Sequence, residues 1–519
     1  MPSERRARLA ESTARAAQTN ASPGENIASA QEAHESLPEA RIISILSQYA
    51  VMQVVLAATG VVRNKVVAFR LGPTAFGELA QIAAIISVAS TLATFGMGVS
   101  LSRNAAKCRT FEERQEQLAN ANGIVLGLSL VVVVAVSSLL GSGYFFRLGA
   151  LTETPATVLA SVLFLAAIPL DALKNNYLAL LQGTLDVKGV AIGRSVAVLF
   201  ATAVAVPVVW FFGFVGAAIQ YLLLSAFIAV LLGWRCRSLG YSPLLARLDR
   251  RRVSLLASFG LASMASAFAQ GLSDTAVRAR LIHVAGAAAN GLLQAPFALA
   301  VTLKEIVLAS IGSVALATIA AKTDHREISR ALDQLLNVVI PIGAAALGLL
   351  GLLGVPALTL LYSKAFSAGA MFFPYVLGAD LLLVLVWVIG APLLARGDRA
   401  LWLALDLVHA AARWSLATLL MPWLGARGVV VGYLVAVALH AAWNLAVCRR
   451  HYRLDIPAKH LRRLLYGMVL VAFLSSTGAR PGGSVPATVA AVVAWIAYVV
   501  HYARREGFMS VLQRRLQRS

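Results

Sequence analysis

The residues best suited to chemistry in this 519-residue chain are charged side chains inside long apolar segments. A charge at the centre of a membrane-spanning helix costs about 2.5–3.5 kcal/mol, so such residues indicate an ion pair, a water-filled cavity or a functional site. Lys304 and Glu305 are adjacent and therefore point about 100° apart on a helix. They cannot share a face, so Lys304 must contact another partner or face water.

Three carboxylates in apolar segments are candidates for ion coupling. Asp171 lies three residues before Lys174 on one helical face, so the two can also simply neutralise each other. Asp380 has no charged neighbour in its segment. A carboxylate in a dry site holds a proton more readily and can exchange it as a cavity opens and closes. The candidates for coupling are Asp171, Glu305 and Asp380.

The histidines and cysteines do not form metal-binding or hydrolytic patterns. His409 shares a helical face with Asp406 and Arg413, which suits pairing between helices as well as a transport role. The eight histidines show no H-x-x-x-H or H-E-x-x-H spacing, and the three cysteines show no C-x-x-C spacing. Nucleotide-binding loops and nucleophile elbows are also absent from the sequence. We therefore expect no enzyme activity, no cofactor and no metal.

These charged residues lie on or beside fourteen apolar segments, each near the ~20 residues that a helix needs to cross the ~30 Å hydrocarbon core. Of the 45 Lys and Arg residues, 33 fall in or within a few residues of the two termini and the even-to-odd connections, and nine fall in or directly beside the odd-to-even connections. This bias follows the positive-inside rule and predicts cytoplasmic N- and C-termini. The predicted spans are 42–62, 79–101, 120–142, 157–181, 190–212, 213–233, 253–273, 292–320, 331–354, 372–394, 401–423, 427–447, 461–477 and 485–503.

The composition agrees with a multi-pass membrane protein. Hydrophobic residues make up 59% of the chain and charged residues 13%, with a net charge of +21. Such a charge can indicate nucleic-acid binding, but here the cations lie in short connections beside the anionic inner leaflet, so we expect no nucleic-acid partner. Residues 1–41 are predicted to be a disordered cytoplasmic tail, and 504–519 a basic one.

The chain resembles itself at a separation of about 212–215 residues. Gly72 begins GPTAFGEL at the second span, and Gly286 begins GAAANGLL at the eighth; a glycine turn at 213–216 likewise parallels 425–428. Chance similarity between alanine-rich helices is the alternative. An offset of six spans gives both copies one membrane orientation, as in transporters built from parallel repeats. The sequence thus predicts an all-α polytopic membrane protein with two six-helix lobes, related by a pseudo-twofold axis, plus two C-terminal helices. The predicted domains are 42–233, 253–447 and 461–503.

Several of these segments resemble a known transporter family. The segment RNKVVAFRLGPTAFG at 63–77, the Leu-Gln-Gly at 181–183 and the two glycine turns are similar to those of bacterial polysaccharide-transport (Wzx-type) flippases. These flippases belong to the multidrug/oligosaccharidyl-lipid/polysaccharide exporter (MOP) superfamily, whose fold is two six-helix lobes with two extra helices in many members. The resemblance implies translocation of a polyprenyl-diphosphate-linked sugar from the cytoplasmic to the periplasmic leaflet.

Cations concentrate at one equivalent region of both repeats, where the topology rule favours a neutral connection. Snorkelling at the membrane interface would explain any one of them. A diphosphate, however, suits the planar fork of arginine, and by resemblance Arg63 is the residue best placed in a cavity. Lys65 and Arg70 can be interfacial. The predicted substrate-binding residues are Arg63, Lys65, Arg70, Arg278, Arg280 and Lys304.

These observations predict a flippase for a lipid-linked oligosaccharide that works by alternating access in the bacterial inner membrane. It would serve cell-surface polysaccharide synthesis, such as lipopolysaccharide or exopolysaccharide, with membrane lipids, a glycan polymerase and export machinery as partners. An ion-coupled multidrug exporter of the same superfamily is one alternative, but it would favour carboxylates in the cavity. A membrane-embedded glycan polymerase or glycosyltransferase is another, but it would need a substantial extracytoplasmic loop.

Overall fold

The computed structural model describes residues 39–108, 110–184, 186–242, 250–320, 324–396, 398–480 and 484–505, and these residues are mostly helical. From Ala50 onward the chain forms one compact unit. The tails predicted at 1–41 and 504–519 lie almost entirely outside the described residues. The helices are α3 (Glu39–Thr94), α4 (Met97–Lys107), α5 (Phe111–Gly141), α6 (Tyr144–Gly149), α7 (Pro155–Gly183), α8 (Val187–Ser238), α9 (Arg250–Ala320), α10 (His325–Leu352), α11 (Gly354–Leu361), η1 (Lys364–Phe372), α12 (Phe373–Arg396), α13 (Arg399–Leu424), α14 (Ala426–Arg450), α15 (Ala458–Gly478) and α16 (Val485–Arg505).

Three of these helices are at least twice as long as a membrane crossing requires, and one glycine breaks each of them. Helices α3, α8 and α9 contain 56, 52 and 71 residues. Inside them, Gly72 has φ 70°, Gly213 has φ 54° and Gly286 has φ 81°. Positive φ is open to glycine but strained for residues with a Cβ atom. Each long helix therefore holds two spans joined by a turn that glycine permits.

The breaks confirm the internal repeat at the level of backbone conformation. Gly72 (φ 70°, ψ 178°) and Gly286 (φ 81°, ψ 164°) occupy equivalent places in the two copies. Gly213 (φ 54°, ψ −120°) and Gly425 (φ 57°, ψ −138°) form a second equivalent pair. Four glycines thus adopt two conformations, each used once in each copy.

The number and type of spans agree with the predicted fold class. Among the described residues, ten helical segments are long and apolar enough to cross a membrane. Three of them, Val51–Thr94, Val187–Ser238 and Gly260–Lys304, hold two predicted spans each. Helix α15 covers the predicted span 461–477. The all-α class with two six-helix lobes and two additional helices is confirmed.

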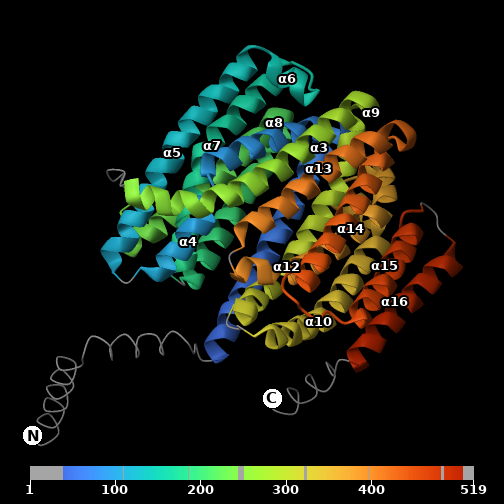
Figure 1. Ribbon diagram of the computed structural model, residues 1–519. Coiled ribbons are helices and arrows are strands. Elements are labelled where there is room, and N and C mark those ends of the chain that lie inside the picture. The colour runs from blue at the N-terminus through green and yellow to red at the C-terminus, as the bar shows by residue number, and fades with distance from the viewer. Residues whose placement is uncertain are drawn as a thin grey trace, which may run out of the picture. The chain divides into compact units, whose positions relative to one another are not determined.

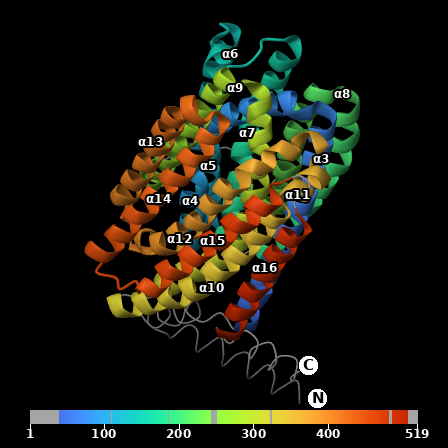
Figure 2. The same cartoon turned by 90° about the vertical axis from the view of Figure 1, so that its right-hand side faces the viewer.

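Helices that follow one another in sequence pack together within each lobe (Figure 1). In the first lobe α7 packs along α8 and also contacts α4 and α5. In the second lobe α13 packs along α14, and α12 contacts α9, α10 and α14. The additional helices α15 and α16 lie side by side along α10 (Figure 2). The two lobes meet where α3 lies against α9.

A continuous apolar core joins the lobes at their meeting point. Phe76 of the first lobe lies edge-on to Tyr362 and Phe366 of the second, with ring centroids 5.9 and 5.4 Å apart. Beside it, the Asn290 side-chain amide donates a 2.8 Å hydrogen bond to the carbonyl oxygen of Gly77. Edge-to-face aromatic pairs add about 0.5–1.5 kcal/mol beyond their buried area. The lobes are therefore closely packed at this level.

Candidate functional site

A cavity of about 530 Å³ lies between the two lobes, and its charged lining is entirely cationic among the described residues. Arg63 comes from α3, Lys174 from α7 and Arg194 from α8. The second lobe contributes residues of α9 and the segment after α11. Polar groups that can bind a hydroxyl or an anion complete the lining, namely Gln53, Asn64, Thr302 and Tyr362. A concave site with convergent polar groups of one charge suits an anionic ligand.

Arg63 is the predicted cation that lines this cavity. One of its terminal nitrogens donates a 2.8 Å hydrogen bond to the hydroxyl of Thr202, which itself donates to the Val198 carbonyl at 2.7 Å. Within the described residues no carboxylate pairs with Arg63. The hydrogen bond holds the guanidinium in place through one nitrogen. Its other donors remain suited to a bidentate contact with an anion.

Lys174 also faces the cavity, but its charge is matched. It forms an ion pair with Asp171, as the three-residue spacing predicts. The same carboxylate accepts hydrogen bonds from Tyr221 at 2.7 Å and from Ser225 at 2.6 Å. Asp171 is thus fully engaged within the first lobe, and the pair adds a strong dipole to the cavity wall rather than a net charge.

Arg194 is a cavity residue that the sequence analysis missed. It lies only four residues inside the predicted span 190–212, where a basic residue is readily assigned to the membrane interface. Helix α8 in fact begins at Val187, so Arg194 lies about two turns into the helix. The position of Arg194 inside an apolar helix, rather than in a connection, is the sequence signal that could have identified it.

The other predicted cations do not reach this cavity. Lys65 and Arg280 are exposed. Arg70 is also exposed and donates to the Trp210 carbonyl at 3.2 Å. Arg278 pairs with Asp274 at 2.8 Å on its own helix. The structure therefore brings one of the six predicted substrate-binding residues, Arg63, into the cavity.

Lys304 reaches another partner, and that partner is Asp380. The Lys304 Nζ lies 2.8 Å from Asp380 Oδ1, and the two side chains are 14% and 2% exposed. The Tyr433 hydroxyl donates to the same oxygen at 3.1 Å. The second oxygen, Oδ2, is buried with no hydrogen-bond partner among the described residues. A buried pair of this kind is costly to break, because the remaining charge loses its partner.

Asp274 and Arg413 form a second ion pair in the second lobe, which also contains the Lys304–Asp380 pair. Asp274 accepts from both Arg278 and Arg413, so one carboxylate serves two guanidinium groups. The Arg413 guanidinium also lies over the Tyr433 ring, 5.0 Å from its centroid. Tyr433 therefore touches both of these charge pairs of the second lobe. The resulting network links α9, α12, α13 and α14.

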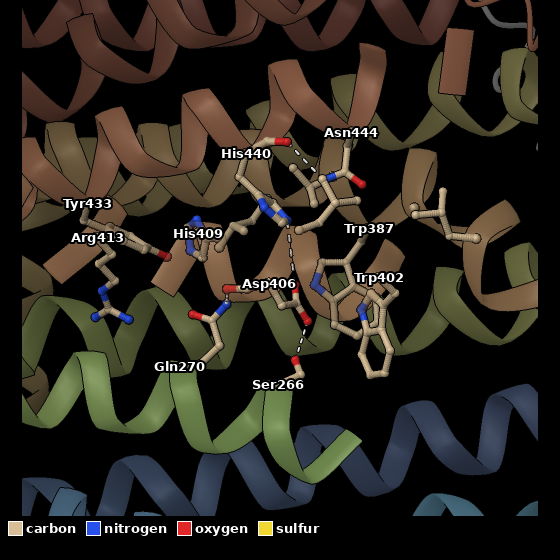
Figure 3. A pocket seen from close by; sticks show the side chains of 15 residues that line it. Ser266, Gln270, Trp387, Trp402, Asp406, His409, Arg413, Tyr433, His440 and Asn444 are labelled. Atoms are coloured by element: carbon tan, nitrogen blue, oxygen red, sulfur yellow. Dashed lines mark hydrogen bonds and ion pairs between the residues drawn. The ribbon is translucent and has the colours of Figure 1, made fainter. Parts of the chain in front are cut away.

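A second cavity of about 390 Å³ lies within the second lobe and contains titratable groups (Figure 3). Asp406 accepts a hydrogen bond from Ser266, and its Oδ1 lies 4.0 Å from His440 Nε2. The rings of His409 and His440 are 4.7 Å apart between centroids. Gln270 closes the site by donating to the Asp406 backbone carbonyl at 3.3 Å. Two imidazoles and one carboxylate that line the same cavity can bind and release a proton.

The structure separates the three candidates for ion coupling. Asp171 and Asp380 are each engaged with a lysine and a tyrosine, in different lobes. Glu305 lies in α9, but its side chain is outside the described residues. Asp406 is the carboxylate that shares a cavity with histidines. The sequence showed its helical face but not His440, which comes from the next helix.

Comparison with known proteins places the chain in one family. Residues 46–323 match the family model described as polysaccharide biosynthesis protein. The lipid III flippases of Escherichia coli (strain K12) and Shigella flexneri are each 23% identical over 389 residues, covering 73% of this chain and 92% of theirs.

Solved structures share the fold at low sequence identity. The lipid II flippase MurJ in an inward closed conformation has a TM-score of 0.69 at 13% identity, over 91% of this chain and 99% of its own. An inward-facing multidrug resistance MATE transporter of the MOP superfamily has a TM-score of 0.60 at 14% identity, over 82% and 99%. These proteins are flippases and transporters rather than enzymes. The chain therefore belongs to the polysaccharide biosynthesis protein family and has the fold of the MOP superfamily transporters.

Proposed function

We propose that this protein is a flippase that moves a polyprenyl-diphosphate-linked oligosaccharide from the cytoplasmic to the periplasmic leaflet of the bacterial inner membrane. The observation that carries the proposal is the cationic cavity between the lobes, with Arg63 held there through one nitrogen. The family match and the relatives named as lipid III flippases support it. Export of the lipid-linked sugar would supply cell-surface polysaccharide synthesis, such as lipopolysaccharide or exopolysaccharide.

In this proposal different residues of the cavity wall bind different parts of the lipid-linked oligosaccharide. Arg63 and Arg194 bind the diphosphate, because a guanidinium fork matches phosphate oxygens in pairs. Gln53, Asn64 and Thr302 offer donors and acceptors to sugar hydroxyls. The polyprenyl chain stays in lipid, where its transfer into a polar cavity would cost free energy. The headgroup alone then crosses the membrane inside the protein.

In this proposal the two lobes, which enclose the cavity between them, move against each other by alternating access. The termini are cytoplasmic in this proposal, by the positive-inside rule. Moving negative charge outward across an inside-negative membrane is favourable by about 2.3 kcal/mol per charge per 100 mV. The membrane potential, consumption of the product outside by a glycan polymerase and export machinery, or ion exchange can therefore drive the cycle.

An ion-coupled multidrug exporter is the second candidate, because MATE transporters share the fold. Such a protein needs negative charge in its cavity for cationic drugs. Here the charged lining of the central cavity is cationic among the described residues. The one cavity carboxylate that faces histidines, Asp406, lies in the second lobe instead. Anionic cargo fits the central cavity better.

The test is glycan export in a flippase-deleted host with a matched pair of arginine variants. Arg63→Ala should lower export at least ten-fold at normal membrane abundance, because each charge-assisted bond to a phosphate contributes about 1.5–3 kcal/mol. Arg70→Ala removes the same residue type from an exposed position on the same helix and should export normally. Equal export by both variants would overturn the proposal, and drug efflux by the wild type would favour the exporter.

A further inference from the structure

A second basic cavity, separate from the central one, lies between the two additional helices α15 and α16. It has a volume of about 350 Å³ and lies at the end where α15 begins and α16 ends. It shares no lining residue with the cavity that contains Arg63. Three cations from α15 meet three aromatic residues from α16 there. They are Lys459, Arg462, Arg463, Tyr498, His501 and Tyr502.

The cavity carries an excess of positive charge. Lys459 pairs with Asp333 of α10 at 2.6 Å, and His460 contacts the same carboxylate at 2.7 Å. Arg463 donates to Asn337 and lies over the Tyr502 ring, 5.7 Å from its centroid. Arg462 is exposed. Among the described residues the carboxylate that contacts this lining, Asp333, pairs with Lys459, so the exposed Arg462 leaves the site with a positive charge that suits an anion.

An apolar groove of about 190 Å³ continues from this cavity along α10 and α16. Tyr498 and Tyr502 line both the cavity and the groove. Beyond the tyrosines the groove is lined almost only by apolar side chains, including Val338, Ile342 and Val499. The Trp495 indole donates to the Ala345 carbonyl at 2.9 Å and fixes α16 against α10. The buried Tyr498 hydroxyl has no hydrogen-bond partner among the described residues, so a donor remains at the junction.

We propose that this cavity and groove form one binding site for an anionic phospholipid, with the headgroup phosphate between Arg462 and Arg463 and one acyl chain in the groove. Basic pockets between transmembrane helices suit anionic headgroups, and tyrosines prefer the level of the headgroups. An acyl chain gains free energy when it leaves water but little when it leaves lipid, so the phosphate provides the selectivity. The site would tie the additional helices to the leaflet that carries more negative charge.

The test is native mass spectrometry of the full-length protein with dioctanoyl phosphatidylglycerol and dioctanoyl phosphatidylcholine. We expect phosphatidylglycerol to bind at least ten-fold more tightly. Arg462→Gln should reduce that preference several-fold without affecting the fold, because Arg462 is exposed. Adding Arg463→Gln should abolish the preference. The matched control Arg450→Gln, an exposed arginine at the end of α14, should retain it.

Two further arms distinguish the source of the phosphate. Val338→Trp fills the groove and should weaken both lipids, whereas inorganic phosphate at millimolar concentration should not displace phosphatidylglycerol. The proposal is overturned if the two lipids bind equally, or if Arg450→Gln lowers the preference as much as Arg462→Gln. It is also overturned if undecaprenyl phosphate binds here more tightly than phosphatidylglycerol and is lost in the same variants, because the site would then belong to the cargo.

Discussion

Gly77 and Gly291, which occupy equivalent places in the two repeats, lie against each other where the lobes cross. A Cβ atom on Gly77 would overlap the Ala287 carbonyl and lie 2.7 Å from the Gly291 nitrogen. A Cβ atom on Gly291 would overlap the Pro73 carbonyl and lie 3.1 Å from the Gly77 nitrogen. The contact is thus reciprocal, as a pseudo-twofold axis requires.

This crossing should not tolerate alanine. Gly291→Ala forces two backbones apart, and overpacking of this kind costs about 1–3 kcal/mol. We expect a lower melting temperature and lower membrane abundance. Gly127→Ala is the control, because no atom lies within 4 Å of its Cβ position and alanine favours a helix. Thermal unfolding of both variants as fluorescent fusions checks this, and equal stability would show that the lobes do not touch at Gly291.

The Lys304–Asp380 pair should behave as a structural unit. Lys304→Met leaves a buried carboxylate without its cation and should cost about 3–5 kcal/mol. Adding Asp380→Leu should recover much of that loss, because neither charge remains. Lys65→Met, at an exposed position, should have no effect. A Lys304→Met protein of normal stability that cannot export glycan would instead place Lys304 in contact with the cargo.

Asp406 is the carboxylate that we expect to couple proton movement to export. Asp406→Asn keeps the shape of the site and removes its proton exchange beside His440 and His409. We expect flipping in proteoliposomes to lose its dependence on the pH gradient while flipping without a gradient persists. Asp171→Asn, in the other lobe, is the comparison. If Asp406→Asn retains the gradient dependence and Asp171→Asn loses it, coupling belongs to the first lobe.

A pH-dependent contribution to stability should come from Asp186, at the start of α8. Arg235 donates to it at 2.6 and 3.0 Å, and these hydrogen bonds hold the pKa of the Asp186 carboxyl below its ordinary value. A lowered folded-state pKa contributes stability that is present above the unfolded-state pKa, about 3.9, and lost as the pH falls through the folded value.

Asp186→Asn removes this contribution. Wild type should therefore be more stable than Asp186→Asn by a constant amount from pH 7 to pH 5. The difference should shrink below about pH 4, where the Asp186 carboxyl of the unfolded chain begins to take up a proton. Melting temperatures of both proteins across this range provide the measurement. A difference that instead grows as the pH falls would contradict the assigned ion pair.

The fold was accessible from the sequence because a bilayer imposes a strong and local constraint. Span length, basic connections and the glycines at 72, 213, 286 and 425 each leave a signal within one segment. The charge pairs leave no such signal. Lys304 and Asp380 are 76 residues apart and Arg413 and Asp274 are 139 apart, so only the packing of helices shows that they meet. Arg63 could be singled out by resemblance, but Arg194 could not.

The central claim is that Arg63 binds the anionic headgroup of the cargo, and flipping by purified protein tests it most directly. Lipid-linked oligosaccharide would be accumulated in one leaflet of proteoliposomes, and its appearance in the other would be followed for wild type, Arg63→Ala, Arg63→Lys and Arg70→Ala. We predict that Arg63→Ala flips at least ten-fold more slowly, Arg63→Lys retains part of the rate, and Arg70→Ala matches wild type. Flipping by Arg63→Ala at the wild-type rate would contradict the cationic-cavity account.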